Sequence, residues 1–170
     1  MIDDGGPLQK LGLALLLIAS LTGCYRARRK EPLSVINVAD PAASKQLVGG
    51  FYKIEAKSWR WTAREFVVSL LPPPGSDRKG AKLSLHFFIP DGQIANLGPM
   101  TLSAEIDDFA MAPETYTKSG DHYYIRDIPA NLLRTNVLPV IFSFDKASEP
   151  SPADGRELGA VVSLISLIPN

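Results

Sequence analysis

The densest group of residues able to do chemistry is an aromatic and basic segment between positions 52 and 64. Tyr52 is followed by Trp59-Arg60-Trp61 and then by Arg64. In an extended strand, Trp59 and Trp61 fall on one face and Arg60 on the other. Exposed indole and phenol rings form platforms for sugar rings, and arginine hydrogen-bonds hydroxyls or anionic groups. The segment therefore predicts a surface that binds a saccharide or another polymer.

The same rings have a structural interpretation, because tryptophan is the largest core residue and is buried on average. We favour a core position for Trp61 and leave Trp59 open between core and surface. Near the C-terminus, Arg156-Glu157-Leu158-Gly159 follows a turn, and its glycine predicts a bulge or a close backbone approach where the last strand enters the sheet. The candidate ligand-binding residues are Tyr52, Trp59, Arg60, Trp61, Arg64 and Arg156.

Arrangements typical of enzymes are sparse in this chain. Its two histidines are His86, on the predicted outward face of a strand, and His122, beside a turn. Ser119, Asp121 and His122 are too close in sequence to take the opposed geometry of a catalytic triad. The acidic pair at 107–108 points to opposite faces of a strand, and a hairpin turn explains it better than a catalytic site. No nucleotide-binding, zinc-protease or serine-hydrolase motif is present. We therefore predict a protein that is not an enzyme and has no cofactor or metal.

An apolar run at the N-terminus predicts export. Residues 11–23 are uncharged, follow Lys10, and are fewer than the about 20 residues that span a bilayer. The run ends in Leu21-Thr22-Gly23-Cys24, which resembles the lipobox of bacterial lipoprotein precursors. The resemblance implies that a lipid such as palmitate is attached to Cys24 and that residues 1–23 are then removed. An uncleaved N-terminal anchor remains the alternative. Cys24 is the chain's one cysteine, so an internal disulfide is excluded.

The residues after Cys24 bear on the membrane and on other partners. Each of four basic side chains would add about 1 kcal/mol of attraction to anionic head groups, unless they are only the solvated end of a tether. These are Arg26, Arg28, Arg29 and Lys30. Tyr25, in place of the aspartate that often retains lipoproteins in the inner membrane, favours the outer membrane facing the periplasm if the source is Gram-negative.

With 18 basic and 18 acidic residues, the near-neutral chain is not expected to bind nucleic acid.

The remaining sequence predicts the scaffold. We expect a signal peptide at 1–23, a lipidated cysteine and flexible tether at 24–48, and a β domain at 49–170. Residues alternate with a period of two, as in half-buried strands, between breakers rich in proline, glycine and serine. Strands are expected at 66–70, 82–87, 100–106, 123–128, 140–145 and 160–168. The last run is apolar at nearly every position, which predicts a central strand covered on both faces.

This pattern predicts an all-β fold, an antiparallel β-sandwich of about seven to nine strands that is jelly-roll-like or immunoglobulin-like, preceded by a signal-peptide helix. Single helical turns are expected at 93–97 and 130–133. The short run at 35–38 lies in the predicted tether, but it has the composition of an edge strand.

A diffuse family resemblance covers residues 49–168. It rests on Gly50-Phe51-Tyr52, on Trp59-Arg60-Trp61-Thr62 and on the Arg156-Glu157-Leu158-Gly159 entry to the closing strand. This combination is similar to β-sandwich modules attached to bacterial envelope glycosyltransferases and methyltransferases. The resemblance implies a jelly-roll-like sandwich with a glycan-related or assembly role, and it carries over no catalytic motif.

Three hypotheses remain. The first is a lipid-anchored cell-envelope protein that binds a saccharide or envelope polymer through its aromatic and arginine surface. The second is a structural or assembly subunit of an envelope protein complex, with the aromatic cluster in the core. The third is a hydrolase, which rests only on His86, His122 and scattered carboxylates.

Overall fold

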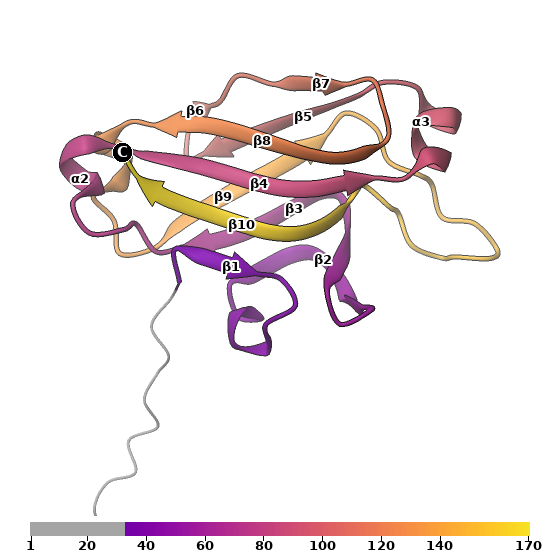
Figure 1. Ribbon diagram of the computed structural model, residues 1–170, viewed down its shortest axis with the longest axis horizontal. Helices are drawn as coiled ribbons and strands as arrows, with labels where there is room; N and C mark the ends of the chain where they lie inside the picture. The colour runs from indigo at the N-terminus through magenta and orange to yellow at the C-terminus, as the bar shows by residue number, and fades with distance from the viewer. Residues whose placement is uncertain (1–32) are drawn as a thin grey trace, which may run out of the picture. The chain divides into compact units, whose positions relative to one another are not determined.

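The computed structural model describes residues 33–170, which form one antiparallel sheet of ten strands with short helices between them (Figure 1). The strands are β1 (Val35–Asn37), β2 (Leu47–Glu55), β3 (Trp59–Leu70), β4 (Ala81–Ile89), β5 (Met100–Ile106), β6 (Phe109–Ala110), β7 (Glu114–Tyr116), β8 (Gly120–Ile128), β9 (Leu138–Phe144) and β10 (Val161–Pro169). The helices are η1 (Pro41–Ala43), α2 (Ser76–Lys79), α3 (Asp91–Leu97) and η2 (Ala130–Leu133).

The long strand β3 is where the sheet curls into two layers. Its second half, from Glu65 to Leu70, pairs with β9, whereas Arg60 and Trp61 in its first half pair with β10. Strands β9 and β5 thus continue into one layer, and β10, β4 and β8 continue into the other (Figure 1). The predicted all-β antiparallel sandwich is confirmed. The structure has more strands than expected because β1, β6 and β7 have only two or three residues each.

The core lies between the two layers and is built by alternate residues of each strand. In β3, β4, β5 and β9, every apolar side chain that the alternation places inward is buried, as predicted. Aromatic rings join the layers: Phe142 stacks on Phe66 at 5.1 Å between ring centroids and meets Tyr124 of β8 edge-on at 6.4 Å. The predicted turns are also present, since 107–108 closes the β5–β6 hairpin and the two expected helical turns lie in α3 and η2.

The β domain starts earlier in the chain than predicted. Residues 33–48 belong to the fold and not to a tether, because β1 pairs with β10, and Ile36 and Val38 are fully buried in the core. The run at 35–38 is too short to show a clear alternation, and the prolines on either side of it favoured a linker. The predicted signal-peptide helix, Cys24 and the basic residues at 26–30 lie outside the described residues. Within the described part of the chain, no helix has the length and hydropathy needed to cross a membrane.

The apolar strand β10 is central in the sheet, but one of its faces is open. Val162, Ile165 and Leu167 point into the core, whereas Leu164 is 37% exposed and Ile168 is 51% exposed on the outer face. The prediction that both faces are covered is therefore wrong for the outer face. An apolar sequence shows that a strand is hydrophobic, but it does not show whether another layer covers the outer face of that strand.

Gly159 marks the point where β10 joins β3. Its N–H donates to the carbonyl of Thr62 at 2.7 Å, and a Cβ at this position would lie 2.5 Å from the carbonyl oxygen of Ala63. The close backbone approach predicted for this glycine is confirmed, since no larger side chain fits there without moving a strand.

Gly50 provides a stability prediction. Its φ of +73° belongs to the left-handed region, and a Cβ there would lie 2.1 Å from the carbonyl oxygen of Glu65. Gly50→Ala should therefore lower the free energy of unfolding by about 1–3 kcal/mol or more, measured by urea denaturation. The neighbouring Gly49→Ala is the matched control, because nothing lies within 4 Å of its added Cβ. Equal stability of the two variants would contradict the steric argument.

Candidate functional site

A cleft of about 470 Å³ lies on the outer face of the layer formed by β3, β10, β4 and β8. The strand register explains its composition: Trp61 pairs with Val161, Val161 with Phe88, and Phe88 with Asp121. Residues directly opposite each other share a face of the sheet, so these side chains form a row across four strands. The cleft is lined by Trp59, Trp61, His86, Phe88, Pro90, Asp121, Val161 and Ser163.

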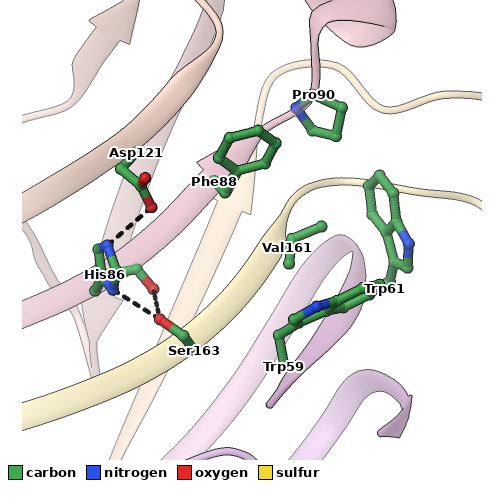
Figure 2. Close-up of a pocket in the computed structure, with 8 residues that line it drawn as sticks. All are labelled: Trp59, Trp61, His86, Phe88, Pro90, Asp121, Val161 and Ser163. Atoms are coloured by element: carbon green, nitrogen blue, oxygen red, sulfur yellow. Dashed lines mark hydrogen bonds and ion pairs between the residues drawn. The ribbon is translucent and has the colours of Figure 1, made fainter. Parts of the chain in front are cut away.

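The cleft has an aromatic side and a polar side (Figure 2). The indoles of Trp59 and Trp61 come from β3, two residues apart, and lie on one side of Val161. His86 and Asp121 lie on the other side with Ser163, contributed by β4, β8 and β10. A ligand in the cleft would therefore meet a mainly apolar surface, with hydrogen-bonding groups confined to the side of the exposed Asp121.

The polar side is a connected line of three side chains. Ser163 Oγ is hydrogen-bonded to His86 Nδ1 at 2.7 Å, and His86 Nε2 is hydrogen-bonded to Asp121 Oδ1 at 3.1 Å (Figure 2). Tyr123 of β8 stacks on the His86 ring at 4.5 Å between centroids with an interplanar angle of 17°. These contacts hold the imidazole of His86 in one orientation, and they fix the positions of Ser163 and Asp121 in the cleft.

The three residue types of this line are those of a Ser-His-Asp hydrolase. Such catalysis depends on donors that stabilise an oxyanion in a site from which water is excluded. Here the Asp121 side chain is 68% exposed and the line lies on an open sheet face. Within residues 33–170, no group of three or more His, Cys, Asp or Glu side chains is placed to hold a metal ion. The arrangement is suited to hydrogen-bonding a ligand.

Sequence reasoning did not find this line, although it placed His86 on an outward strand face. Its three members are 35 or more residues apart in the chain. They meet because β4 pairs with both β8 and β10, and that pairing is not visible in a single sequence.

The structure separates the residues that the sequence grouped around Trp59. Both tryptophans line the cleft and are half-buried, so the core position that we favoured for Trp61 is wrong. Arg60 points away from them, as its place between them in a strand requires. Its Nε donates to the carbonyl of Val38 at 2.7 Å and its Nη1 to the carbonyl of Tyr52 at 2.9 Å. The half-buried guanidinium thus ties β2 and the segment after β1 to β3.

Arg156 lies in a separate cluster on the loop between β9 and β10. Its guanidinium forms an ion pair with Glu55 at 2.7 Å and with Asp154 at 2.8 Å, and lies 5.2 Å from the Tyr52 ring centroid. Glu55 is the cross-strand partner of Trp59, so this cluster is beside the aromatic side of the cleft. The Arg156 segment therefore lies near the Trp-Arg-Trp segment of β3.

Both the backbone and the side chain of Arg64 contact Glu157, the residue that follows Arg156. Its backbone N–H donates to Glu157 Oε2 at 3.0 Å, and its Nε lies 3.7 Å from Glu157 Oε1. The Arg64 side chain itself is 58% exposed. Of the six predicted residues, the two tryptophans line the cleft and the three arginines and Tyr52 do not.

The Arg156 cluster predicts a pH-dependent contribution to stability. The hydrogen bond from Arg156 lowers the pKa of Asp154 below its ordinary 3.8, and the two carboxylates raise the pKa of Arg156. Because the folded-state pKa of Asp154 is depressed, its contribution is present above pH 3.8 and is lost as the pH falls through the folded-state pKa. Arg156→Gln should therefore lower the free energy of unfolding at pH 7, and this deficit should narrow below pH 3.8.

Urea denaturation at pH 7, 5, 3 and 2 measures this effect. The exposed Arg78 of α2 supplies the control variant, Arg78→Gln, which should show little deficit at any of these pH values. A deficit for Arg156→Gln that is unchanged at pH 2 would show that the ion pairs do not cause it.

Comparisons with known proteins add a distant structural likeness. No family model matches the chain, and no curated protein sequence matches it. The chain is similar to a solved structure described as "CBM4 structure and function". The two chains are 10% identical with a TM-score of 0.35, and the match covers 80% of this chain and 85% of the other.

Proposed function

We propose that this protein binds a saccharide in the cleft without catalysing a reaction. The observation that carries the proposal is the pairing of two half-buried indoles with the Ser163–His86–Asp121 line on opposite sides of one cleft. A sugar ring has apolar C–H faces and a rim of hydroxyls. The indoles offer flat apolar surface for the faces, and the exposed Asp121 carboxylate and the Ser163 oxygen offer acceptors for the hydroxyls of the rim.

The charged oxygen of Asp121 strengthens this complementarity. A hydroxyl that donates to an ionised carboxylate forms a shorter and stronger hydrogen bond than one between neutral groups. Most polar contacts of the cleft are fixed before a ligand arrives, because His86 is held by Ser163, Asp121 and the Tyr123 ring. Such preorganisation lowers the entropy lost on binding.

Tryptophan fluorescence is a direct test, because the chain has two tryptophans and both line the cleft. The full emission signal therefore comes from the proposed site. Titration with neutral and anionic polysaccharides should shift the emission for at least one of them, and the bound ligand should protect the indoles from acrylamide quenching. If no polysaccharide changes emission, quenching or migration in an affinity gel, the proposed function is wrong.

The absence of catalysis is part of the proposal and has its own prediction. A fluorophosphonate probe should label Ser163 no more than it labels the Ser163→Ala variant, and nitrophenyl acetate hydrolysis should equal that of this variant. The physical reason is the exposure of Asp121 and the open sheet face, where water competes for every hydrogen bond of an oxyanion. Stoichiometric labelling of Ser163, identified by peptide mass spectrometry, would favour hydrolysis instead.

We also propose that the domain is held at the cell envelope by a lipid on Cys24, at the outer membrane if the source is Gram-negative. The proposal is supported by the lipobox-like Leu21-Thr22-Gly23-Cys24 at the end of an apolar run. Mass spectrometry of the mature protein should find a lipid-modified Cys24 at its N-terminus. An unmodified cysteine, or an intact segment 1–23, would contradict it.

A second function is favoured by apolar side chains on the same sheet face beyond the cleft. Val35, Ile125 and Ile168 are each 45–51% exposed there. A structural role in an envelope complex would cover these side chains with a protein partner. Crosslinking in cells, with a photoreactive residue at Ile125, would then recover one dominant protein, whereas a saccharide-binding domain should give no single protein adduct.

A further inference from the structure

The outer sheet face has aromatic side chains at both ends of the cleft's polar line. At one end are the two tryptophans of β3, and at the other is Tyr123 of β8, a residue that is 56% exposed although its ring stacks on His86. Tyr123 is two residues from Asp121 on the same strand, so both point to the same face of the sheet. The aromatic surface therefore continues beyond the residues that line the cleft.

The strand register sets the separation of these aromatic positions. Three neighbouring pairs, β3 with β10, β10 with β4, and β4 with β8, connect Trp61 to the strand of Tyr123. At about 4.8 Å between paired strands, β3 and β8 are about 14 Å apart on this face. One sugar ring stacked on an indole cannot also reach the Tyr123 ring, but a chain of at least three rings can.

The charges around the cleft restrict the chemistry of that chain. Of the residues that line the cleft, Asp121 is the one carboxylate, and none is lysine or arginine. Arg60 is held by backbone carbonyls on the other face, and Arg156 is neutralised by Glu55 and Asp154. A uronic-acid or sulfated polymer would therefore meet an acid and no lysine or arginine in the lining, at a cost in desolvation and repulsion.

We infer that the ligand is an uncharged saccharide chain of at least three sugar units, lying across the strands from Trp61 to Tyr123. This inference rests on the proposed function and specifies its ligand. Trp59 and Trp61 form the primary stacking position, the Ser163–His86–Asp121 line binds the hydroxyls between, and Tyr123 forms a second stacking position.

The test begins with affinity gel electrophoresis on neutral laminarin, xylan, galactomannan and hydroxyethyl cellulose, and on anionic polygalacturonate, alginate and hyaluronan. At least one neutral polymer should retard the protein, and the anionic polymers should not. Oligosaccharides of one to six units from the best neutral polymer are then titrated by calorimetry. Affinity should rise about tenfold or more between two units and the longer chains as the second aromatic position is reached.

Variants at Tyr123 link that gain to the second position. Tyr123→Ala should abolish the difference in affinity between two units and longer chains, in addition to any loss for two units that follows from releasing His86. Tyr123→Phe, which keeps a ring stacked on His86, should retain the gain for longer chains. Phe109→Ala is the control, since Phe109 is an exposed aromatic residue on β6, which is not among the cleft strands.

The outcomes distinguish this inference from the proposed function. Preference for an anionic polymer, or affinity that does not depend on chain length or on Tyr123, would overturn the inference and leave saccharide binding in place. Lack of binding to every polymer would overturn both.

Discussion

Trp61→Ala is expected to weaken saccharide binding by about 2 kcal/mol or more, roughly 30-fold in the dissociation constant. Trp61 stands at the aromatic end of the cleft, in register with Val161 and Phe88. Removing its indole takes away one of the two flat indole surfaces available to a sugar ring and opens that side of the cleft to water. Calorimetric titration of the wild type and the variant with the best neutral oligosaccharide measures the change.

The design of this experiment separates binding from folding. Trp61 is half-buried and outside the core, so the variant should keep a cooperative urea transition at nearly the wild-type midpoint. Trp61→Phe should recover part of the affinity because it restores a smaller aromatic face. An alanine variant that is folded and binds with wild-type affinity would show that the saccharide does not occupy this cleft.

The second large effect concerns the core. Phe142→Ala should lower the free energy of unfolding by about 3–5 kcal/mol, a large share of the stability of a domain this size. The Phe142 ring is fully buried, stacks on Phe66 of β3 and meets Tyr124 of β8, so it contacts both layers of the sandwich. The cavity left by its removal would lie between the layers, where neither can collapse into it without breaking strand pairing.

The preceding residue is the matched control for this substitution. Ile141 is on the same strand but on its outer face, 38% exposed, so Ile141→Ala should cost less than about 1 kcal/mol. Equilibrium denaturation by urea compares the two variants with the wild type. A cost for Phe142→Ala as small as that for Ile141→Ala would mean that the layers do not depend on this ring for their packing.

The period-two pattern was sufficient to predict the layers but not their boundaries. In Phe66-Val67-Val68-Ser69-Leu70 the alternation identifies the buried face because each inward position is apolar. In β1 it fails, since three residues are too few to show a period and the buried Ile36 looks the same as a chance apolar residue. In β10 both faces are apolar, so the alternation is absent and the open outer face could not be recognised.

The candidate site was only half predictable for a similar physical reason. Trp59 and Trp61 share a face because they are two residues apart on one strand, and such local geometry can be derived from spacing. Ser163 and Asp121 reach His86 through strand pairing between distant segments, which depends on the whole topology. Arg60 and Arg156 were predicted as ligand-binding residues because arginine often binds hydroxyls and anions. In the structure, however, Arg60 is hydrogen-bonded to a backbone carbonyl and Arg156 is paired with carboxylates, and these contacts cannot be derived from local spacing.

The alternation on β3, β4, β8 and β10 also has a consequence for how this domain can diverge. Alternate residues of these strands supply the core, for example Phe66, Leu85 and Tyr124, and cannot change freely. Residues between them, such as Trp61 and Phe88, line the cleft and contribute little to the packing of the layers. Ligand preference can therefore drift by substitution at positions such as 61, 88 and 123 while the scaffold stays the same. The same independence makes this sheet face a suitable surface for directed evolution, with a library confined to outward positions and a core left untouched.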